Sequence, residues 1–332
     1  MTPKRIEAVD SLRGLAALSV AWFHFTYANT IAREGTLQSL GKYGWLGVEV
    51  FFVISGFIIP YSLHRAGYRL KDFKIFLVKR LTRLDPPYFL SILLVLAVEY
   101  ALTLAPHYSG APFRPGLLRI LLHFGYLNVI AGYEWLNPVY WTLAIEFQYY
   151  LLMALIFPLI SSQRRWRRLL VFVILTLLGW KLTSGAFIFH FIFLFCMGMA
   201  LFQYWVNIIG KLEFYLLLGL FTCGSYLMLG IPYTLAGLVG VAGIAFLRIR
   251  NPVLIFLGTI SYSLYLVHPP VTKIVFTLGR SHAESNLERA LLIFGALAAS
   301  IFAAWVSYLL VEKPAQKWSA SFKYRRQVKA ES

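Results

Sequence analysis

The feature that most constrains this chain is the recurrence of apolar segments, each close to 20 residues long, from one end to the other. A helix of about 20 apolar residues is long enough to cross the hydrocarbon core of a bilayer. Only 14% of the 332 residues are charged, whereas a soluble domain carries charge on about a quarter of its residues. The sequence therefore predicts an all-α, polytopic integral membrane protein.

Hydropathy predicts about ten membrane-spanning helices in a single domain over residues 1–332. They lie near residues 11–29, 44–63, 87–105, 139–160, 168–184, 186–206, 211–229, 232–248, 253–275 and 289–311. No internal repeat or separate soluble domain is visible. Cys196 and Cys223 both fall inside apolar segments, which is expected of small core residues and not of a disulfide or a metal site.

The basic residues indicate how the helices are oriented. The chain carries 31 Lys and Arg against 14 Asp and Glu, a formal net charge of +17. In a soluble protein this balance would suggest nucleic acid, but here the cations lie in short loops, where they set topology and meet anionic lipid headgroups. With both termini cytoplasmic, about 23 Lys and Arg fall on the inner side and about 7 on the outer side. The inner set comprises residues 65–83, the arginines of 164–168, Arg248, Arg250 and a basic cytoplasmic tail over 312–332.

Residues 106–138 lie on the outer side in this topology. Their moderately apolar stretch, 117–129, is interrupted by Arg119, His123 and Asn128. It is too short and too polar to span a bilayer, so we expect a re-entrant or interfacial element.

Ionisable residues inside apolar segments are costly in a bilayer and are candidate functional residues. Arg13 and His24 lie on the first predicted helix. Eleven residues make three turns plus about 20°, so the two side chains share one face and lie about 16 Å apart along the axis. Arg13 is then close to the cytoplasmic surface and His24 is in the outer half of the membrane. Glu49, Glu146 and His268 are predicted at a similar depth on three other helices.

Each of these residues also has a purely structural interpretation. A histidine in an apolar helix can pack against a neighbour, and a buried carboxylate can neutralise a buried partner. We expect His24 and Glu146 to be functional, and Glu49 and His190 to be structural. Both interpretations stay open for His268, which precedes two prolines at a predicted helix break.

Arg80 and Arg83 lie three residues apart on a helix that is predicted to end before the prolines at 86–87. Such a pair suits a phosphate, which arginine binds in a bidentate manner. The same pair also fits a stop-transfer cluster under the positive-inside rule.

The second apolar segment has small residues at Gly44, Gly47, Ser55 and Gly56. Small residues allow two helices to approach closely. The same notches would also admit a thin ligand such as an acyl chain.

Five motifs together resemble the acyltransferase-3 family of membrane acyltransferases, and the resemblance covers nearly the whole chain. They are Asp10-Ser-Leu-Arg13 with Arg13-x10-His24, Gly47-Val-Glu-Val-Phe51-Phe52-Val-Ile-Ser55-Gly56-Phe57, Arg80-x-x-Arg83-Leu-x-Pro86, Trp141-Thr-Leu-Ala-Ile-Glu146-Phe-Gln-Tyr149-Tyr150-Leu, and Ser261-Tyr-Ser-Leu-Tyr265-Leu-Val-His268. Each motif alone is modest, but five in the right order and spacing are hard to produce by chance. Thr142 stands where the family often has Ser, and it keeps the hydroxyl.

The resemblance implies an O-acyltransferase, most simply an O-acetyltransferase, of a bacterial inner (plasma) membrane. It would move an acyl group from cytoplasmic acyl-coenzyme A to a carbohydrate or glycolipid, such as a polysaccharide or lipopolysaccharide of the cell envelope. Acyl-coenzyme A is a co-substrate, and no tightly bound cofactor or metal is expected. Because no esterase-like domain follows the last span, the transfer would be completed within the membrane domain.

The same resemblance implies roles for individual residues. The catalytic residues would be His24 as the base, with Glu146 and Arg13. The donor would be bound by Arg80, Arg83, Arg13 and Ser55, and the acceptor side would comprise Trp141, Tyr265, His268 and Glu49.

Two other classes of function compete with this interpretation. A proton-coupled transporter or flippase of an anionic or lipid-linked sugar would also use a basic rim and buried His and Glu residues, but it should show internal repeats or paired interrupted helices. A structural membrane subunit would not explain why Arg13 and His24 share one face. A homodimer through one of the small-residue faces is compatible with the sequence.

Overall fold

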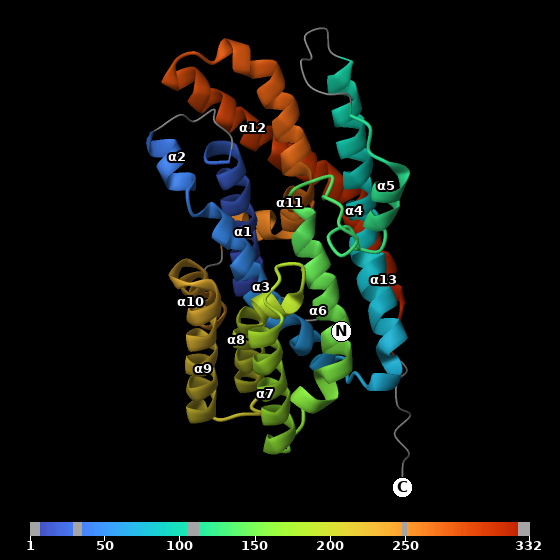
Figure 1. The fold of residues 1–332 in the computed structure, drawn as a ribbon, viewed down its shortest axis with the longest axis vertical. Coiled ribbons are helices and arrows are strands. Elements are labelled where there is room, and N and C mark those ends of the chain that lie inside the picture. Colours follow the sequence, from blue (N-terminus) through green and yellow to red (C-terminus); the bar gives the residue numbers. More distant parts are fainter. Residues whose placement is uncertain (1–6, 29–34, 105–112, 248–250, 325–332) are drawn as a thin grey trace.

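The computed structural model describes residues 7–28, 35–104, 113–247 and 251–324 (Figure 1). Within these ranges the chain is helical and contains no β-strand, so the predicted all-α fold is confirmed. The helices are α1 (Glu7–Thr26), α2 (Thr36–Gly41), η2 (Gly44–Leu46), α3 (Gly47–Arg65), η3 (Leu70–Asp72), α4 (Phe73–Thr103), α5 (Leu117–His123), α6 (Tyr140–Ile160), α7 (Arg165–Lys181), η4 (Ile188–Phe191), α8 (Ile192–Trp205), α9 (Lys211–Leu229), α10 (Ile231–Phe246), α11 (Pro252–Gly279), η5 (Arg280–His282), α12 (Asn286–Ser307), the π-helical turn η6 (Tyr308–Glu312) and α13 (Lys313–Ser321).

Seven helical stretches of the described chain are long and apolar enough to cross a membrane. They contain α3, α4, α6, α8, α9, α11 and α12. Helices also lie at the three remaining predicted spans, but α7 and α10 have only 17 and 16 residues, and α1 carries Glu7, Asp10 and Arg13 in its first two turns. The predicted number of ten spans and the orientation of the termini therefore stay predictions.

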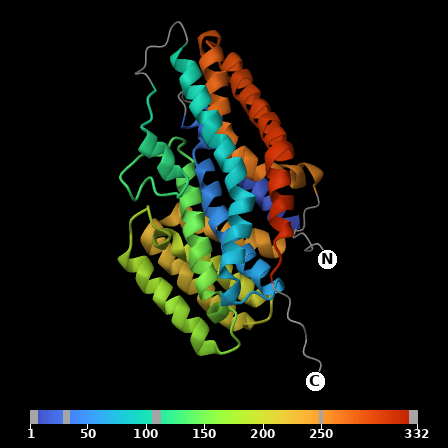
Figure 2. The same cartoon turned by 90° about the vertical axis from the view of Figure 1, so that its right-hand side faces the viewer.

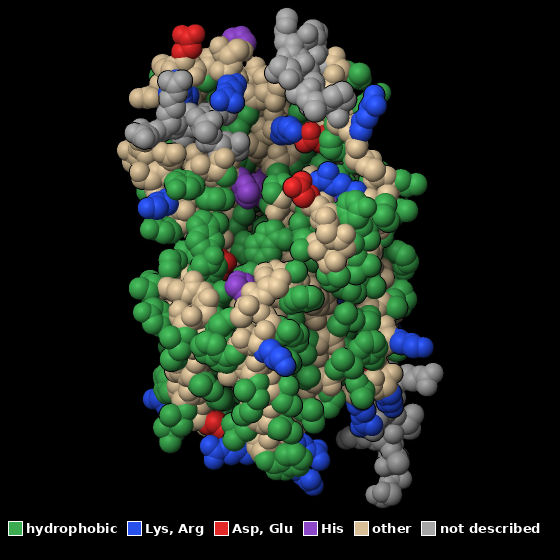
Figure 3. Space-filling view, in the orientation of Figure 1, with side chains coloured by type: hydrophobic (Ala, Val, Ile, Leu, Met, Phe, Trp, Pro, Cys, Tyr) green, Lys and Arg blue, Asp and Glu red, His purple; other side chains and the backbone are tan. Residues whose placement is uncertain are grey.

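The helices form one elongated bundle in which α1 packs against both α3 and α11. In Figures 1 and 2, α7 to α10 gather at one end, while α4, α11 and α12 extend towards the other end. Figure 3 shows that hydrophobic side chains cover most of one face and that Lys and Arg side chains gather at its lower end. This surface suits a lipid environment bounded by charged headgroups.

Small residues bring neighbouring backbones into direct contact. A Cβ added at Gly47 would lie 2.4 Å from the Ala16 oxygen of α1, and one added at Gly56 would lie 2.3 Å from the Phe195 oxygen of α8. Such distances are shorter than any real Cβ contact, so only glycine fits at these positions. Of the two roles considered for these notches, the structure therefore supports close helix packing.

The predicted helix end before the prolines at 86–87 and the predicted helix break at 269–270 are wrong, because α4 and α11 run through these prolines. Proline lacks the N–H that would bond the carbonyl four residues earlier. In α11, Pro270 leaves the Leu266 carbonyl without its helical donor, and that oxygen accepts hydrogen bonds from Ser91 Oγ at 3.3 Å and Asn137 Nδ2 at 3.2 Å. Neighbouring polar groups thus allow the helix to continue through the prolines.

Part of the predicted basic tail is folded. Helix α13 packs along α4, and Lys79 Nζ donates to the carbonyl oxygens of Ser319 at 3.0 Å and Phe322 at 2.6 Å. Arg248, Arg250 and the end of the tail, 325–332, lie outside the described residues. Cys196 is buried as expected, but Cys223 is exposed on α9 and is not a core residue.

Candidate active site

A small cavity lies where α1, α3, α6 and α11 meet. Its volume is about 150 Å³. The residues that line it are Val20, Phe23, His24, Trp45, Val48, Glu49, Pro138, Val139, Trp141 and Tyr265. Four residues proposed from the sequence, His24, Glu49, Trp141 and Tyr265, are therefore brought together around one cavity. It is mainly aromatic and apolar with a few convergent polar groups, as small-molecule sites usually are.

His24 and His268 form a pair at this cavity. Their ring centroids lie 5.1 Å apart at an interplanar angle of 49°. His268 is fully buried, and its Nδ1 lies 3.0 Å from the Leu264 carbonyl oxygen. Because a carbonyl only accepts, Nδ1 is the protonated nitrogen of the neutral ring and Nε2 is an acceptor. Within the described chain, no atom hydrogen-bonds that Nε2.

Glu49 and Tyr265 supply further polar groups to the cavity wall. Glu49 is only 2% exposed, and its Oε2 has no hydrogen-bond partner within the described chain. The Tyr265 hydroxyl lies 2.9 Å from Thr142 Oγ1, so the Thr that replaces the family's usual Ser uses its hydroxyl here. A buried carboxyl oxygen without a partner is costly, and this oxygen belongs to a residue that lines the cavity.

Glu146 does not line this cavity. Its Oε1 accepts hydrogen bonds from Ser55 Oγ at 3.4 Å and from the Tyr150 hydroxyl. Thr142 and Glu146 are one turn apart on α6, and the charges of both Glu49 and Glu146 act on Tyr265. Glu146 therefore lies further along α6 than Val139 and Trp141, which line the cavity.

Arg13, Arg80 and Arg83 form a second cluster. The Arg80 guanidinium carbon lies 5.5 Å from the ring centre of Phe76 and 5.4 Å from that of Tyr150. Arg83 lies within electrostatic reach of both Arg13 and Arg80. The three arginines predicted to bind the donor thus come from two helices, α1 and α4, and share one region.

Glu312 belongs to this arginine cluster and was missed by sequence reasoning, which placed it at the start of the tail. It is 3% exposed. Its Oε2 accepts from the backbone N–H of Ser263 at 3.2 Å and from Ser263 Oγ at 2.6 Å, while Oε1 accepts from Gln316 Nε2 at 3.0 Å. Its charge also acts on Arg83. The available signal was an acidic residue that directly follows an apolar segment and precedes a strongly basic tail.

Tyr150 was also missed as a site residue. It stands four residues after Glu146 on α6, a spacing at which helical side chains meet. It hydrogen-bonds Glu146 with its hydroxyl and presents its ring to Arg80. It therefore joins the carboxylate to the arginine cluster.

The described residues contain no group of three or more His, Cys, Asp or Glu side chains that could hold a metal ion. The ionisable groups that these residues bring together are a histidine pair towards one end of α1 and an arginine cluster towards the other. Arg13 and His24 lie on the same continuous helix, about 16 Å apart along its axis. The protein thus has a proton acceptor towards one end of α1 and an anion site towards its other end.

Fold and site together define an all-helical membrane protein with a buried histidine pair and an internal arginine cluster. Residues 6–310 match the family model described as an acyltransferase domain, and the chain belongs to this acyltransferase-3 family.

Individual relatives cover only part of the chain. Over 161 residues it is 31% identical to protein ORF330 of Acidianus two-tailed virus, which is provisionally named an acetyltransferase; the match covers 47% of this chain and 42% of that protein. Over 170 residues it is 29% identical to O-acetyltransferase OatA of Staphylococcus aureus, covering 48% of this chain and 25% of OatA. A third relative, an uncharacterized protein of Haemophilus influenzae, is 31% identical over 141 residues, which are 40% of this chain and 56% of that protein. The chain thus spans between a quarter and little more than half of the length of these relatives, and no solved structure matches it.

Proposed function

We propose that this protein is a membrane O-acyltransferase, most simply an O-acetyltransferase. It moves an acyl group from cytoplasmic acyl-coenzyme A to a hydroxyl of a cell-surface or lipid-linked carbohydrate, such as a polysaccharide or lipopolysaccharide. The observation that carries this proposal is the separation of Arg13 and His24 on one helix, with an arginine cluster around the first and an aromatic cavity around the second. Membership of the acyltransferase family and the name of OatA support it.

His24 is the catalytic base in this proposal. Neutral imidazole has a suitable pKa to remove a proton from a hydroxyl in the transition state, and a positioned base contributes about 10²–10⁴-fold in rate. As His24 takes the proton, the acceptor oxygen bonds to the acyl carbon and the carbon–sulfur bond breaks. The departing thiolate then recovers the proton from His24, so the histidine is unchanged after each turnover.

His268 and Glu49 support this base. The Nε2 of His268, which no atom of the described chain hydrogen-bonds, can accept an N–H from the neighbouring His24 ring, and this bond would fix the tautomer of His24. The unpartnered oxygen of Glu49 can accept a hydrogen bond from a sugar hydroxyl in the cavity. Trp141 and Tyr265 supply flat apolar faces against which a sugar ring can pack.

The arginine cluster binds the donor in this proposal. Arginine suits the coenzyme's diphosphate because its planar guanidinium makes paired, charge-assisted hydrogen bonds with phosphate oxygens. The charged end of the donor then stays near the basic end of α4, and only the slender thioester arm enters the bundle. Glu146 and Ser55 lie between the two regions, where that arm would pass.

Binding of acetyl-coenzyme A to the purified protein in nanodiscs tests the proposal. Wild type should bind saturably, and Arg80→Gln/Arg83→Gln should bind at least tenfold more weakly. The matched control is Arg164→Gln/Arg167→Gln, which removes the same charge from the start of α7, away from the cluster, and should bind like wild type. His24→Ala should bind the donor but transfer no acetyl group.

Two outcomes would overturn the proposal. If the control double variant loses as much affinity as the cluster variant, the arginines act only through general charge. If well-folded wild type binds neither acetyl- nor longer acyl-coenzyme A, the transporter interpretation takes its place.

A further inference from the structure

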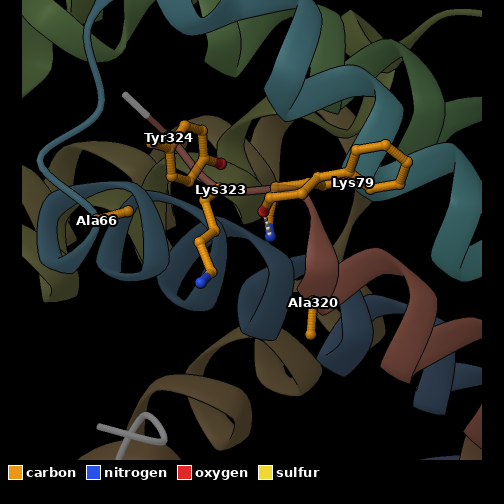
Figure 4. A pocket seen from close by; sticks show the side chains of 6 residues that line it. Ala66, Lys79, Ala320, Lys323 and Tyr324 are labelled. Carbon is orange, nitrogen blue, oxygen red and sulfur yellow. Dashed lines mark hydrogen bonds between the residues drawn. The ribbon is translucent and has the colours of Figure 1, made fainter. Parts of the chain in front are cut away.

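A larger cavity opens at the end of the bundle where α4 and α13 meet, and it is separate from the cavity beside His24. Its volume is about 530 Å³. The residues that line it are Ala66, Lys79, Ala320, Phe322, Lys323 and Tyr324 (Figure 4). Two lysines and two aromatic rings therefore face one space that no role assigned so far uses.

The cavity is built by specific contacts. Lys79 Nζ holds the end of α13 and the residue after it through the carbonyls of Ser319 and Phe322, and Ser319 Oγ donates to the Lys79 carbonyl oxygen at 2.7 Å. The Lys79 ammonium also lies 5.7 Å from the Tyr324 ring centre. An ammonium has three donors, and Lys79 gives two of them to carbonyls. Lys323 is exposed, and no hydrogen bond or ion pair to its ammonium is found among the described residues.

This cavity adjoins the arginine cluster. Arg80 follows Lys79 on α4, and its charge reaches Tyr324. Burial raises the pKa of the Tyr324 hydroxyl, and Arg80 opposes this rise while Asp72 adds to it. A row of cations thus leads from Lys323 past Lys79 and Arg80 to Arg83.

The charges of the arginine cluster match only part of coenzyme A. Three arginines and Glu312 leave a net charge of +2, because three positive charges are offset by one negative charge. A diphosphate carries two negative charges. The coenzyme also has a phosphomonoester on its ribose 3′ oxygen, which adds about −1.5 to −2 near pH 7. This group needs a cation of its own, close to the diphosphate site, because both phosphate groups are attached to the same ribose.

We propose that the cavity between α4 and α13 binds the nucleotide end of the donor, with Lys323 as the ligand of the ribose 3′-phosphate. Lys79 holds the wall in place and has one donor left for the same phosphate, and Tyr324 offers its ring to the adenine. The inference rests on the proposed use of acyl-coenzyme A, and it adds a second anion site that selects the intact coenzyme over shorter thioester donors.

Steady-state kinetics with acetyl-coenzyme A and its 3′-dephospho analogue test this site. For wild type, KM should be about three- to tenfold higher for the analogue, because one charge-assisted contact is lost, while kcat stays within twofold. Lys323→Gln should raise KM for acetyl-coenzyme A by the same factor and leave KM for the analogue unchanged. Lys323→Arg should restore discrimination. Lys317→Gln, which removes an equally exposed lysine from α13 outside the cavity, should behave like wild type.

The measurements separate this inference from the proposed function. If wild type uses both donors equally well, or if Lys323→Gln raises KM equally for both, the second anion site is refuted while the acyltransferase stands. If the effect of Lys323→Gln appears only in nanodiscs that contain anionic lipid, the cavity binds a lipid headgroup and the inference is also refuted. If no acyl-coenzyme A supports transfer or binds, both proposals fall.

Discussion

Tyr150 shows how one side chain can serve two charged neighbours. Its hydroxyl donates to Glu146 and its ring lies under the guanidinium of Arg80. The hydroxyl contact requires an oxygen, whereas the ring contact requires only an aromatic face. Substitutions can therefore separate the two functions.

Tyr150→Phe should lower kcat about fivefold or more and leave the KM for acetyl-coenzyme A within twofold, since Glu146 loses one of its two donors but Arg80 keeps its ring. Tyr150→Leu should show the same loss of kcat and also raise KM about threefold or more, because a cation–π contact contributes about 0.5–2 kcal/mol. The check is a pair of saturation curves. An equal rise of KM in both variants would show that the ring does not position Arg80.

At this scale the sequence could predict that some of the candidate residues lie close together, but not the position of each one. His24 and Glu49, which were expected at a similar depth, line one cavity together with Trp141 and Tyr265, which the family resemblance had implied. Glu146 was also expected at the depth of His24; it does not line this cavity, and it hydrogen-bonds Ser55 and Tyr150. Depth along a helix follows from counting residues, whereas the face that a side chain presents depends on helix packing, which one sequence does not reveal.

Among the elements, α11 depends on groups from other helices to pass through its prolines. Asn137 is 1% exposed; its Nδ2 donates to Leu266 O, and its Oδ1 accepts from the Val139 N–H at 3.3 Å. Pro138 and Val139, beside it, line the histidine cavity. The Leu266 carbonyl, which Pro270 leaves without its helical donor, thus anchors the segment that enters α6 through its hydrogen bond with Asn137. The sequence predicted a helix break here, because hydrogen bonds from distant polar groups are not visible in a local pattern.

Asn137→Ala should lower the free energy of unfolding by about 1–2 kcal/mol, since the Leu266 carbonyl would keep only its longer bond to Ser91. In a Pro270→Ala background the new N–H at position 270 can bond that carbonyl, so Asn137→Ala should cost about 0.5–1 kcal/mol less. Unfolding of all four proteins in matched detergent gives the coupling. Equal costs in both backgrounds would show that Asn137 does not compensate for the proline.

The segment between α4 and α6 is organised around His123, which was expected only to interrupt an apolar stretch. Its Nε2 accepts from the Leu136 N–H at 3.1 Å, and its Nδ1 lies 2.8 Å from the Arg119 carbonyl oxygen. The ring is therefore neutral with its proton on Nδ1. Burial lowers the pKa of His123, and the charge of Arg119 acts in the same direction.

Because the folded pKa lies below the unfolded value of about 6.5, this stabilisation is fully present above about pH 6.5 and is lost as the pH falls through the folded pKa. Amide exchange of residues 117–136 should therefore become several-fold faster in wild type relative to His123→Gln at pH 5.5, with a smaller difference at pH 7.5. Comparing the two proteins at each pH removes the intrinsic pH dependence of exchange. A ratio that does not change with pH would mean that His123 does not titrate in this range.

At the scale of the whole molecule, the proposed mechanism requires the cavity beside His24 to face one side of the membrane. The arginine cluster and the cavity between α4 and α13 must then face the other side. The connections at 66–72 and 161–164 and the end of α13 all lie towards one end of the bundle in Figures 1 and 2. These are the basic parts of the chain. Basic residues near an anionic leaflet contribute about 1 kcal/mol each, which favours a cytoplasmic location.

Single cysteines in a background without Cys196 and Cys223 test both this orientation and the number of spans. A membrane-impermeant maleimide should label Gln163→Cys and Lys317→Cys only in inverted vesicles, and Ser184→Cys only in right-side-out vesicles. The first two lie before α7 and on α13, and Ser184 directly follows α7, which is 17 residues long. A tilted or short helix can still span a bilayer that thins around it.

If Ser184→Cys is instead labelled from the same side as Gln163→Cys, α7 does not cross the membrane and a ten-helix topology is wrong. If Lys317→Cys is labelled from the outer side, the donor cavity between α4 and α13 cannot meet a cytoplasmic coenzyme.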